Sequence, residues 1–314
     1  MSPPDLHELL EFAVDAAHQA GRLTRLHFNR HVAVERKADG SPVTIADRGA
    51  EELLRRLIER RFPKHGVVGE EFGETPGREP ARWILDPIDG TYSFICGVPL
   101  YSVLVGFEWC GEMLAGVIHM PALGETAYAA RGLGCWWTPA AAHVTANITV
   151  AQPPSAVSGA ERQPGGRQSG GAQPGRHFNS PAAAAGRYTP RDDVVPARVS
   201  DVSELSQARL LYGGAKWMHQ AGRGREFERL LATCHKDRGW GDGYAYALLA
   251  TGRAEIVLDP LMSLWDTAAL LPVVTEAGGT LTDWSGNPTH TAPEALATNG
   301  KLLPAVLAAI GRAR

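Results

Sequence analysis

The composition of the chain changes abruptly between residues 152 and 196. This stretch holds 7 Gly and 7 Pro in 45 residues, about 31%, and it contains no Leu, Ile, Met or Trp. A segment without large apolar side chains cannot bury enough surface to offset the conformational entropy that folding costs. We therefore expect a disordered, low-complexity insertion with bounds at 139–197. The folded core must then come from an N-terminal half, residues 1–138, and a C-terminal half, residues 198–314.

The N-terminal half begins with two segments of helical periodicity. Apolar residues recur every three or four positions from Leu6 to Leu26 and again from Ala50 to Ile58, which predicts two helices with one buried stripe each. Thr44 and Asp47 have the spacing of a capping box for the second helix. Short apolar runs bounded by Gly and Pro then predict strands: Val67–Val68, Trp83–Leu85, Tyr101–Phe107, Leu114–His119 and Thr126–Ala129.

In the C-terminal half, short apolar runs typical of strands alternate with segments of helical spacing. Apolar runs predict strands at Arg209–Tyr212 and Glu255–Leu258. Helical spacing predicts four helices: Glu226–Cys234, Tyr244–Thr251, Trp265–Gly278 and Leu302–Arg312. Alternation of this kind favours an α/β architecture.

Charge and hydropathy exclude several classes of partner. With 31 Lys+Arg against 34 Asp+Glu, the formal net charge is −3, so no general basic surface is expected for nucleic acid or an anionic membrane. No apolar run approaches the ~18 residues of a membrane span, and the first fifteen residues lack the apolar core of a signal peptide. We expect a cytoplasmic protein with small-molecule partners. No CxxC pair is present, so we expect reduced, buried thiols at Cys96, Cys110, Cys135 and Cys234.

The residues best suited to chemistry follow a predicted buried strand. Asp86 and Asp89 stand three positions apart, and the backbone carbonyl of Ile88 lies between them. A hard cation such as Mg²⁺ prefers oxygen ligands, so this turn could hold one. Gly90 and Thr91 add backbone N–H groups of the kind that bind phosphate at a helix N-terminus. An ordinary turn explains the same residues, because Asp, Pro and Gly are common turn formers.

Other acidic residues accompany this turn. Glu70 and Glu71 follow the strand at 67–68, and Asp266 stands near the start of a predicted helix. Each has a simpler explanation, because the glutamates can form a solvated loop and an acidic side chain stabilises a helix N-terminus. Asp47 can likewise serve only as a cap. The residues alone leave these alternatives open.

Taken in order, these motifs resemble the inositol monophosphatase superfamily, the lithium-sensitive, magnesium-dependent phosphatases. The matching segments span nearly the whole chain outside the insertion: residues 37–47, 69–71, 86–91, 265–266 and 276–279. The resemblance implies an α/β fold with an α+β N-terminal half, arranged as a five-layer α/β/α/β/α sandwich. It also implies a homodimer, with metals bound where the two halves meet.

The resemblance further implies roles for individual residues. Two magnesium ions would be bound by four carboxylates and one carbonyl, with Glu70 helping to hold a third, weaker ion: Glu70, Asp86, Asp89, Asp266 and Ile88. Thr91, hydrogen-bonded to Asp47, would orient and deprotonate the attacking water, so the catalytic residues would be Asp47, Glu70 and Thr91. Phosphate would lie on Gly90 and Thr91. The metal-activated water would attack directly, without a covalent enzyme intermediate, which suits the electrostatic demands of phosphoryl transfer.

Three segments are more similar to the histidinol-phosphatase branch than to the inositol branch: residues 93–100, 241–246 and 268–286. By position, Asp89, Asp242 and Asp259 would line the pocket for the alcohol. Histidinol carries an ammonium group and an imidazole that can be protonated, and charge-assisted hydrogen bonds to carboxylates would favour it over a neutral polyol.

The substrate prediction has alternatives. Asp242 could cap a helix, and Asp259 could form an Asp-Pro turn. Tyr92 and Gly243 stand where the histidinol branch often has Lys and Cys. We predict a histidinol-phosphate phosphatase of histidine biosynthesis, and the alternative is an inositol-1-phosphate or broad sugar and polyol phosphate phosphatase.

Overall fold

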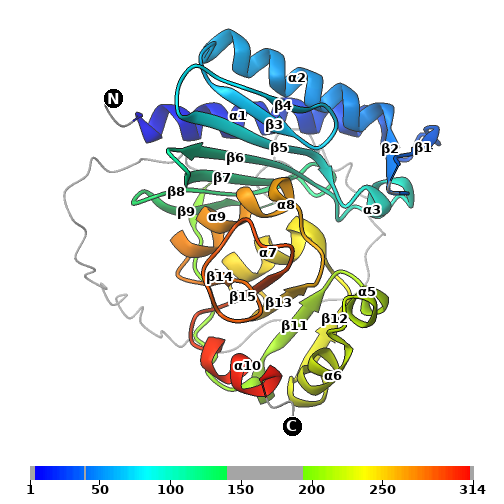
Figure 1. The fold of residues 1–314 in the computed structure, drawn as a ribbon, viewed down its shortest axis with the longest axis vertical. Helices are drawn as coiled ribbons and strands as arrows, with labels where there is room; N and C mark the ends of the chain where they lie inside the picture. The colour runs from blue at the N-terminus through cyan, green and yellow to red at the C-terminus, as the bar shows by residue number, and fades with distance from the viewer. Residues whose placement is uncertain (1–3, 39, 140–193, 312–314) are drawn as a thin grey trace, which may run out of the picture.

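Alternating helix and sheet layers make up the fold in the computed structural model, which describes residues 4–38, 40–139 and 194–311 (Figure 1). Two helices cover an eight-stranded sheet, three helices separate it from a five-stranded sheet, and three more helices cover the far side. The predicted α/β/α/β/α order is confirmed. One hydrophobic cluster lies between the first helices and the larger sheet, a second surrounds the middle helices and contacts both sheets, and a third lies between the smaller sheet and the last helices.

The first layer consists of α1 (Leu6–His27) and α2 (Ile45–Arg61), as the periodicity predicted. The Asp5 side chain accepts hydrogen bonds from the first N–H groups of α1. The predicted capping box of α2 is present, with Thr44 and Asp47 bonded to each other's backbone. The two helices pack against each other and bury their apolar stripes on the sheet below.

The larger sheet has the strand order β10-β9-β8-β7-β6-β5-β3-β4. Its eight strands are β3 (Gly66–Gly69), β4 (Gly73–Thr75), β5 (Ala81–Asp89), β6 (Ser102–Trp109), β7 (Glu112–Met120), β8 (Glu125–Ala130), β9 (Gly134–Thr138) and β10 (Val195–Pro196). The five strands predicted in the N-terminal half are β3, β5, β6, β7 and β8. Only β3 and β5 pair in parallel, so their carboxyl ends lie together. The register of β5 against β6 shifts between Asp86 and Asp89, which re-aims both side chains at the end of the strand.

The predicted insertion, 139–197, lies largely outside the described residues, which omit 140–193. Its last residues differ from the prediction, because Val195 and Pro196 form β10 and pair with Trp137 and Trp136 of β9. The chain therefore completes the larger sheet before it enters the C-terminal half.

The middle layer contains α7 (Asp242–Ala250), α8 (Leu264–Ala268) and α9 (Leu270–Glu276), all from the C-terminal half. They contact both sheets. The sequence predicted one helix where α8 and α9 lie. The break follows from Pro272, which has no N–H for the carbonyl of Ala268, and from the close approach of the Ala269 carbonyl to Gly116.

The smaller sheet has the order β12-β11-β13-β15-β14. Its bounds are β11 (Arg209–Tyr212), β12 (Lys236–Arg238), β13 (Ile256–Asp259), β14 (Thr280–Thr282) and β15 (Ala295–Thr298). Its outer face is covered by α5 (Ala215–Gln220), α6 (Gly224–Thr233) and α10 (Leu303–Ile310). The remaining elements are short: β1 (Val34–Arg36), β2 (Pro42–Thr44), α3 (Thr91–Ile95) and the 3₁₀ turn Leu205–Gln207.

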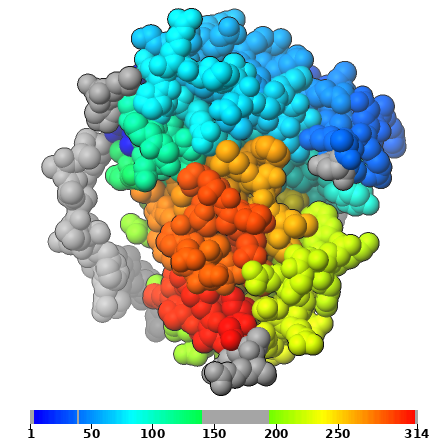
Figure 2. Space-filling view, in the orientation of Figure 1, coloured from blue at the N-terminus to red at the C-terminus, as the bar shows by residue number. Residues whose placement is uncertain are grey.

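The N-terminal half contacts α8 and α9 of the C-terminal half. This boundary is visible in Figure 2, where blue and cyan residues lie next to orange ones. In the described part of the chain, no helix is long and apolar enough to cross a membrane. The expectation of four buried thiols was wrong for Cys96 and Cys110, which are exposed beside turns; Cys135 is buried, and all four are free.

Candidate active site

Three carboxylates from the two halves meet at the end of β5. Asp86 and Asp89 come from this strand, and Asp266 comes from the first turn of α8. Each offers an oxygen, and these three oxygens lie within 4.8 Å of one another. The sequence predicted this acidic cluster, although its members are separated by about half of the chain.

Each carboxylate of the acidic cluster accepts at least one hydrogen bond from the protein. The protein donors are the Ile88 N–H to Asp86 (3.1 Å), the Ser102 hydroxyl (2.6 Å) and Gly243 N–H to Asp89, and the Ser263 N–H to Asp266 (2.7 Å). Asp86 also makes side-chain contacts with Glu70 and Asp266, so the acidic groups lie directly against one another. In the described residues, no Lys or Arg forms an ion pair with any of the three.

The acidic cluster is electrostatically unfavourable by itself. Burial and then the neighbouring carboxylates raise the pKa of Asp86 well above its usual range. Burial also raises the pKa of Asp89 and of Asp266 to about 7, again with a contribution from adjacent acidic groups. Three converging oxygens without a protein cation are the ligand set that a hard divalent metal requires. The residues therefore fit a divalent cation.

Glu70 lies beside the acidic cluster but in an ion pair of its own. Lys37, from the turn between β1 and β2, places its Nζ 2.7 Å from Glu70 and 2.6 Å from Glu71. Burial opposes the lysine charge, but these two carboxylates raise the pKa of Lys37 to about 12. The negative charge of Glu70 still contributes to the raised pKa of Asp86. The predicted ligand is therefore near the cluster and bonded to a lysine.

Glu51 is a site residue that the sequence analysis missed. Its side chain is 0% exposed, and its carboxylate accepts hydrogen bonds from the N–H groups of Glu71 (2.7 Å) and Phe72 (3.2 Å) and from Arg55 (2.8 Å). These bonds fix the loop that carries Glu70. Only the Glu51–Arg55 spacing is visible in the sequence, because the other partners are backbone groups.

Replacing Glu51 with Ala should lower the free energy of unfolding by about 2–3 kcal/mol, because two N–H groups and Arg55 lose their acceptor. Urea unfolding measures this change. Glu52 is the matched control, since it is an exposed neighbour on the same helix, and Glu52→Ala should change stability by about 0.5 kcal/mol or less. Equal losses in the two variants would show that Glu51 does not hold the loop.

Thr91 lies between two oxygen acceptors at the start of α3. Its hydroxyl is 3.3 Å from Asp47 Oδ1 and 3.0 Å from the Ile88 carbonyl. Asp47 caps α2 through Oδ2, and burial raises its pKa. Both interpretations of Asp47 are thus compatible with the geometry, because one oxygen caps and the other faces Thr91. Gly90 precedes α3 with a φ of 82°, a left-handed conformation that glycine adopts readily.

Asp242 does not cap its helix. The residue before α7 is Gly241, and no side chain caps this end. Asp242 has a φ of 57°, and its Oδ2 lies so close to Gly90 that a Cβ there would be only 2.6 Å away. Burial, followed by the charges of Asp259 and Asp266, raises the pKa of Asp242 to about 7. The Asp242 carboxylate therefore lies beside the acidic cluster, and we call the space that it and Asp259 line the acidic pocket.

Asp259 ends β13 and is buried in the same pocket. Its Oδ2 accepts a hydrogen bond of 2.9 Å from the Tyr246 hydroxyl, and it also accepts from the Gly213 N–H. Burial raises the pKa of Asp259 to about 7, with a further contribution from Asp89. Tyr246 is fully buried, as expected for a core residue, and it also orients Asp259. Asp259 thus does more than form a turn.

Comparison with known proteins gives an independent result. The profile of the inositol monophosphatase family matches residues 5–170 and 172–313. The histidinol-phosphatase of Chlorobaculum parvum is 35% identical over 304 residues, covering 96% of each chain, and that of Mycobacterium tuberculosis is 33% identical over 302 residues, covering 96% of this chain and 97% of the relative. The crystal structure of the extragenic suppressor protein suhB from Bartonella henselae has a TM-score of 0.75 at 24% identity, covering 98% of this chain and all of that one.

Proposed function

Because the chain belongs to the inositol monophosphatase family and is a phosphoric monoester hydrolase, we propose that it hydrolyses L-histidinol phosphate with two to three Mg²⁺ ions as cofactor. The main support for this substrate is a pair of buried carboxylates, Asp242 and Asp259, which lie next to the acidic cluster that could hold a metal ion. The similarity to histidinol-phosphatases over nearly the full chain supports the same substrate. A cytoplasmic location and a homodimer stay predictions.

The metal would be held by Asp86, Asp89 and Asp266, together with the Ile88 carbonyl and Glu70. When bound, divalent ions supply positive charge that neutralises and polarises the phosphate. Lys37 would have to release Glu70 for that residue to serve as a ligand, because the lysine ammonium is 2.7 Å from the carboxylate.

The protein itself would position the phosphate and the attacking water. The N–H groups of Gly90 and Thr91 would donate to phosphate oxygens at the start of α3. If the Thr91 hydroxyl donates to Asp47, its lone pairs are free to accept a hydrogen bond from water and so orient it. Asp47 is then the acceptor for the proton that the water loses as its oxygen bonds to phosphorus. The P–O bond to the alcohol breaks in the same step, and the leaving oxygen takes a proton from solvent water.

The alcohol would be recognised by charge. Asp242 and Asp259 would accept hydrogen bonds from the ammonium group and the imidazolium of histidinol. Asp89, itself one of the proposed metal ligands, is close enough to Asp242 for that charge to contribute to its raised pKa, and it would line the same pocket. Tyr246 donates to Oδ2 of Asp259, and Gly213 lies beside Oδ1, so a ligand would share these carboxylate oxygens with protein donors. A neutral polyol would leave these buried carboxylates without a cationic partner, which is unfavourable.

Phosphate release from L-histidinol phosphate and from inositol 1-phosphate tests the proposal. With Mg²⁺ present, kcat/KM for histidinol phosphate should exceed that for inositol 1-phosphate by about tenfold or more, the equivalent of one charge-assisted hydrogen bond. A chelator should remove both activities, and added Mg²⁺ should restore them. A preference for inositol 1-phosphate would support the alternative substrate, and activity that survives chelation would contradict the metal site.

A further inference from the structure

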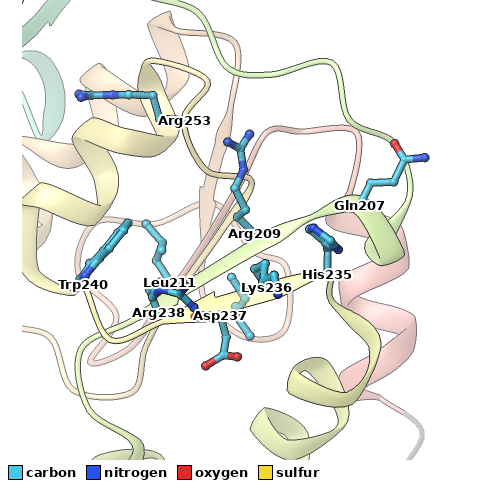
Figure 3. Close-up of a pocket in the computed structure, with 10 residues that line it drawn as sticks. Gln207, Arg209, Leu211, His235, Lys236, Asp237, Arg238, Trp240 and Arg253 are labelled. Carbon is cyan, nitrogen blue, oxygen red and sulfur yellow. Dashed lines mark hydrogen bonds between the residues drawn. The ribbon is translucent and has the colours of Figure 1, made fainter.

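A cavity of about 400 Å³ lies on the smaller sheet, apart from the acidic cluster (Figure 3). None of its lining residues is one of the carboxylates described above. Its lining comes from β11, β12 and the segments that follow β12 and α7. It includes four basic residues, one tryptophan and one acidic residue: Arg209, Lys236, Arg238, Arg253, Trp240 and Asp237.

The cavity exists because β12 is an edge strand. Among the residues that the structure describes, it pairs with β11 alone, in parallel, and the register sets Arg209 beside Lys236 and Leu211 beside Arg238. Alternate residues of a strand face the same side, so these four share one face of the sheet. Helix α7 packs over β11 and β13 on this face. The edge formed by β12 is thus left open.

Two cations of the cavity are already neutralised. Arg209 makes a double hydrogen bond to the buried Glu255, at 2.7 and 3.0 Å. Arg253 lies 2.7 Å from Glu125 and stacks over the ring of Trp137. These interactions fix both guanidinium groups as walls of the cavity.

Two further cations have no such partner. Among the residues that the structure describes, neither Lys236 nor Arg238 forms an ion pair with a carboxylate. The intervening Asp237 turns to the opposite face, where it accepts a hydrogen bond from Tyr212 at 3.2 Å; in Figure 3 its carboxylate points away from Arg209. Arg238 donates to the backbone carbonyl of Asp237 at 2.6 Å. The lining of the cavity therefore includes two cations without an ion-pair partner in the described residues and one carboxylate, that of Asp237, which is bonded to Tyr212.

An aromatic side chain lies at one end of this charged surface. Trp240 is 43% exposed, which is unusual for so large an apolar group, and it follows β12 by two residues. We propose that the cavity binds a small organic dianion with a flat ring, whose phosphate-like group lies on Lys236 and Arg238 and whose ring stacks on Trp240. This inference does not rest on the proposed function.

Phenylphosphonate and methylphosphonate are suitable probes, because both are dianions near pH 8, neither is hydrolysed, and only the first carries a ring. Calorimetric titration of the full chain in chelator, so that no metal recruits the phosphonate to the acidic cluster, should show one site for phenylphosphonate. The double variant Lys236→Gln, Arg238→Gln should weaken binding by about tenfold or more. Lys64→Gln, at an exposed lysine of the other half, should bind like the parent protein.

The contribution of the ring is tested separately. Trp240→Ala should weaken phenylphosphonate by about fivefold and leave methylphosphonate unchanged. All three substituted residues are exposed, so thermal unfolding should show intact folding in both variants. The proposal would be wrong if phenylphosphonate does not bind at millimolar concentration, or if the parent protein and the double variant bind it equally well. Lys236 and Arg238 would then serve only to keep the exposed edge strand from pairing with another chain. Equal losses of both probes in Trp240→Ala would overturn the ring contact.

Discussion

Replacing Asp86 with Asn is expected to lower turnover roughly a thousandfold or more, because the proposed metal site would lose a charged ligand. The fold should survive the change. An Asn carbonyl can keep the hydrogen bond from the Ile88 N–H, and the substitution removes a buried charge that its neighbours repel. Phosphate release gives the rate, and thermal unfolding reports folding and metal binding together.

In chelator, the Asp86→Asn protein should unfold at the same temperature as the parent or at a higher one. Added Mg²⁺ should stabilise the parent by preferential binding to the folded state and should stabilise the variant much less. Asp201→Asn is the matched control, because this side chain is 97% exposed and forms an ion pair with the exposed Lys301. A variant that retains a tenth of the parent rate would contradict the assignment of Asp86 as a metal ligand.

The long elements of the fold could be predicted because burial imposes a period on their sequences. The apolar stripes of α1 and α2 and the runs in β5 to β8 are of this kind, and each is present. Short edge elements carry no such signal. β12 consists of Lys236, Asp237 and Arg238, and its position is fixed by pairing with β11 and not by hydropathy. Strand β10 was hidden for a similar reason, since Pro196 is tolerated only at an edge.

The acidic cluster could be predicted as a set of residues but not as a geometry. The resemblance placed Asp86, Asp89 and Asp266 together, and the structure brings their oxygens within 4.8 Å. What holds them is invisible in the sequence, because the donors are backbone groups and a hydroxyl from other strands and loops. The same holds for Glu51, whose partners are mostly N–H groups of a loop. Pairings of this type depend on tertiary contact and leave no local pattern.

Asp242 is an example of a residue whose role is determined by tertiary contacts and differs from what the local sequence predicts. An acidic residue at the start of a helix predicts a cap. The chain instead places Asp242 in the left-handed region with a φ of 57° and turns its carboxylate toward Gly90. A non-glycine residue in this region is strained unless its surroundings hold it, and such positions occur often at functional sites. The strain therefore supports a role in the substrate pocket.

Replacing Asp242 with Asn should lower kcat/KM for histidinol phosphate by about 10- to 100-fold, the loss expected when one charge-assisted hydrogen bond to a cation is removed. Asn has the same shape and tolerates the left-handed backbone, so the pocket should keep its form. The rate with inositol 1-phosphate should change by about threefold or less, because a neutral polyol gains no ionic contact from Asp242. Steady-state kinetics on both substrates with one enzyme preparation measures the ratio.

The ratio separates substrate recognition from damage to the catalytic centre. Asp242 lies close to Asp259 and Asp266, whose charges contribute to its raised pKa, so a general disturbance of the metal ligands would lower both rates together. Recognition of a cationic alcohol would lower only one. Equal losses on the two substrates would remove the proposed role of Asp242 and would leave Asp259 as the carboxylate that selects the substrate.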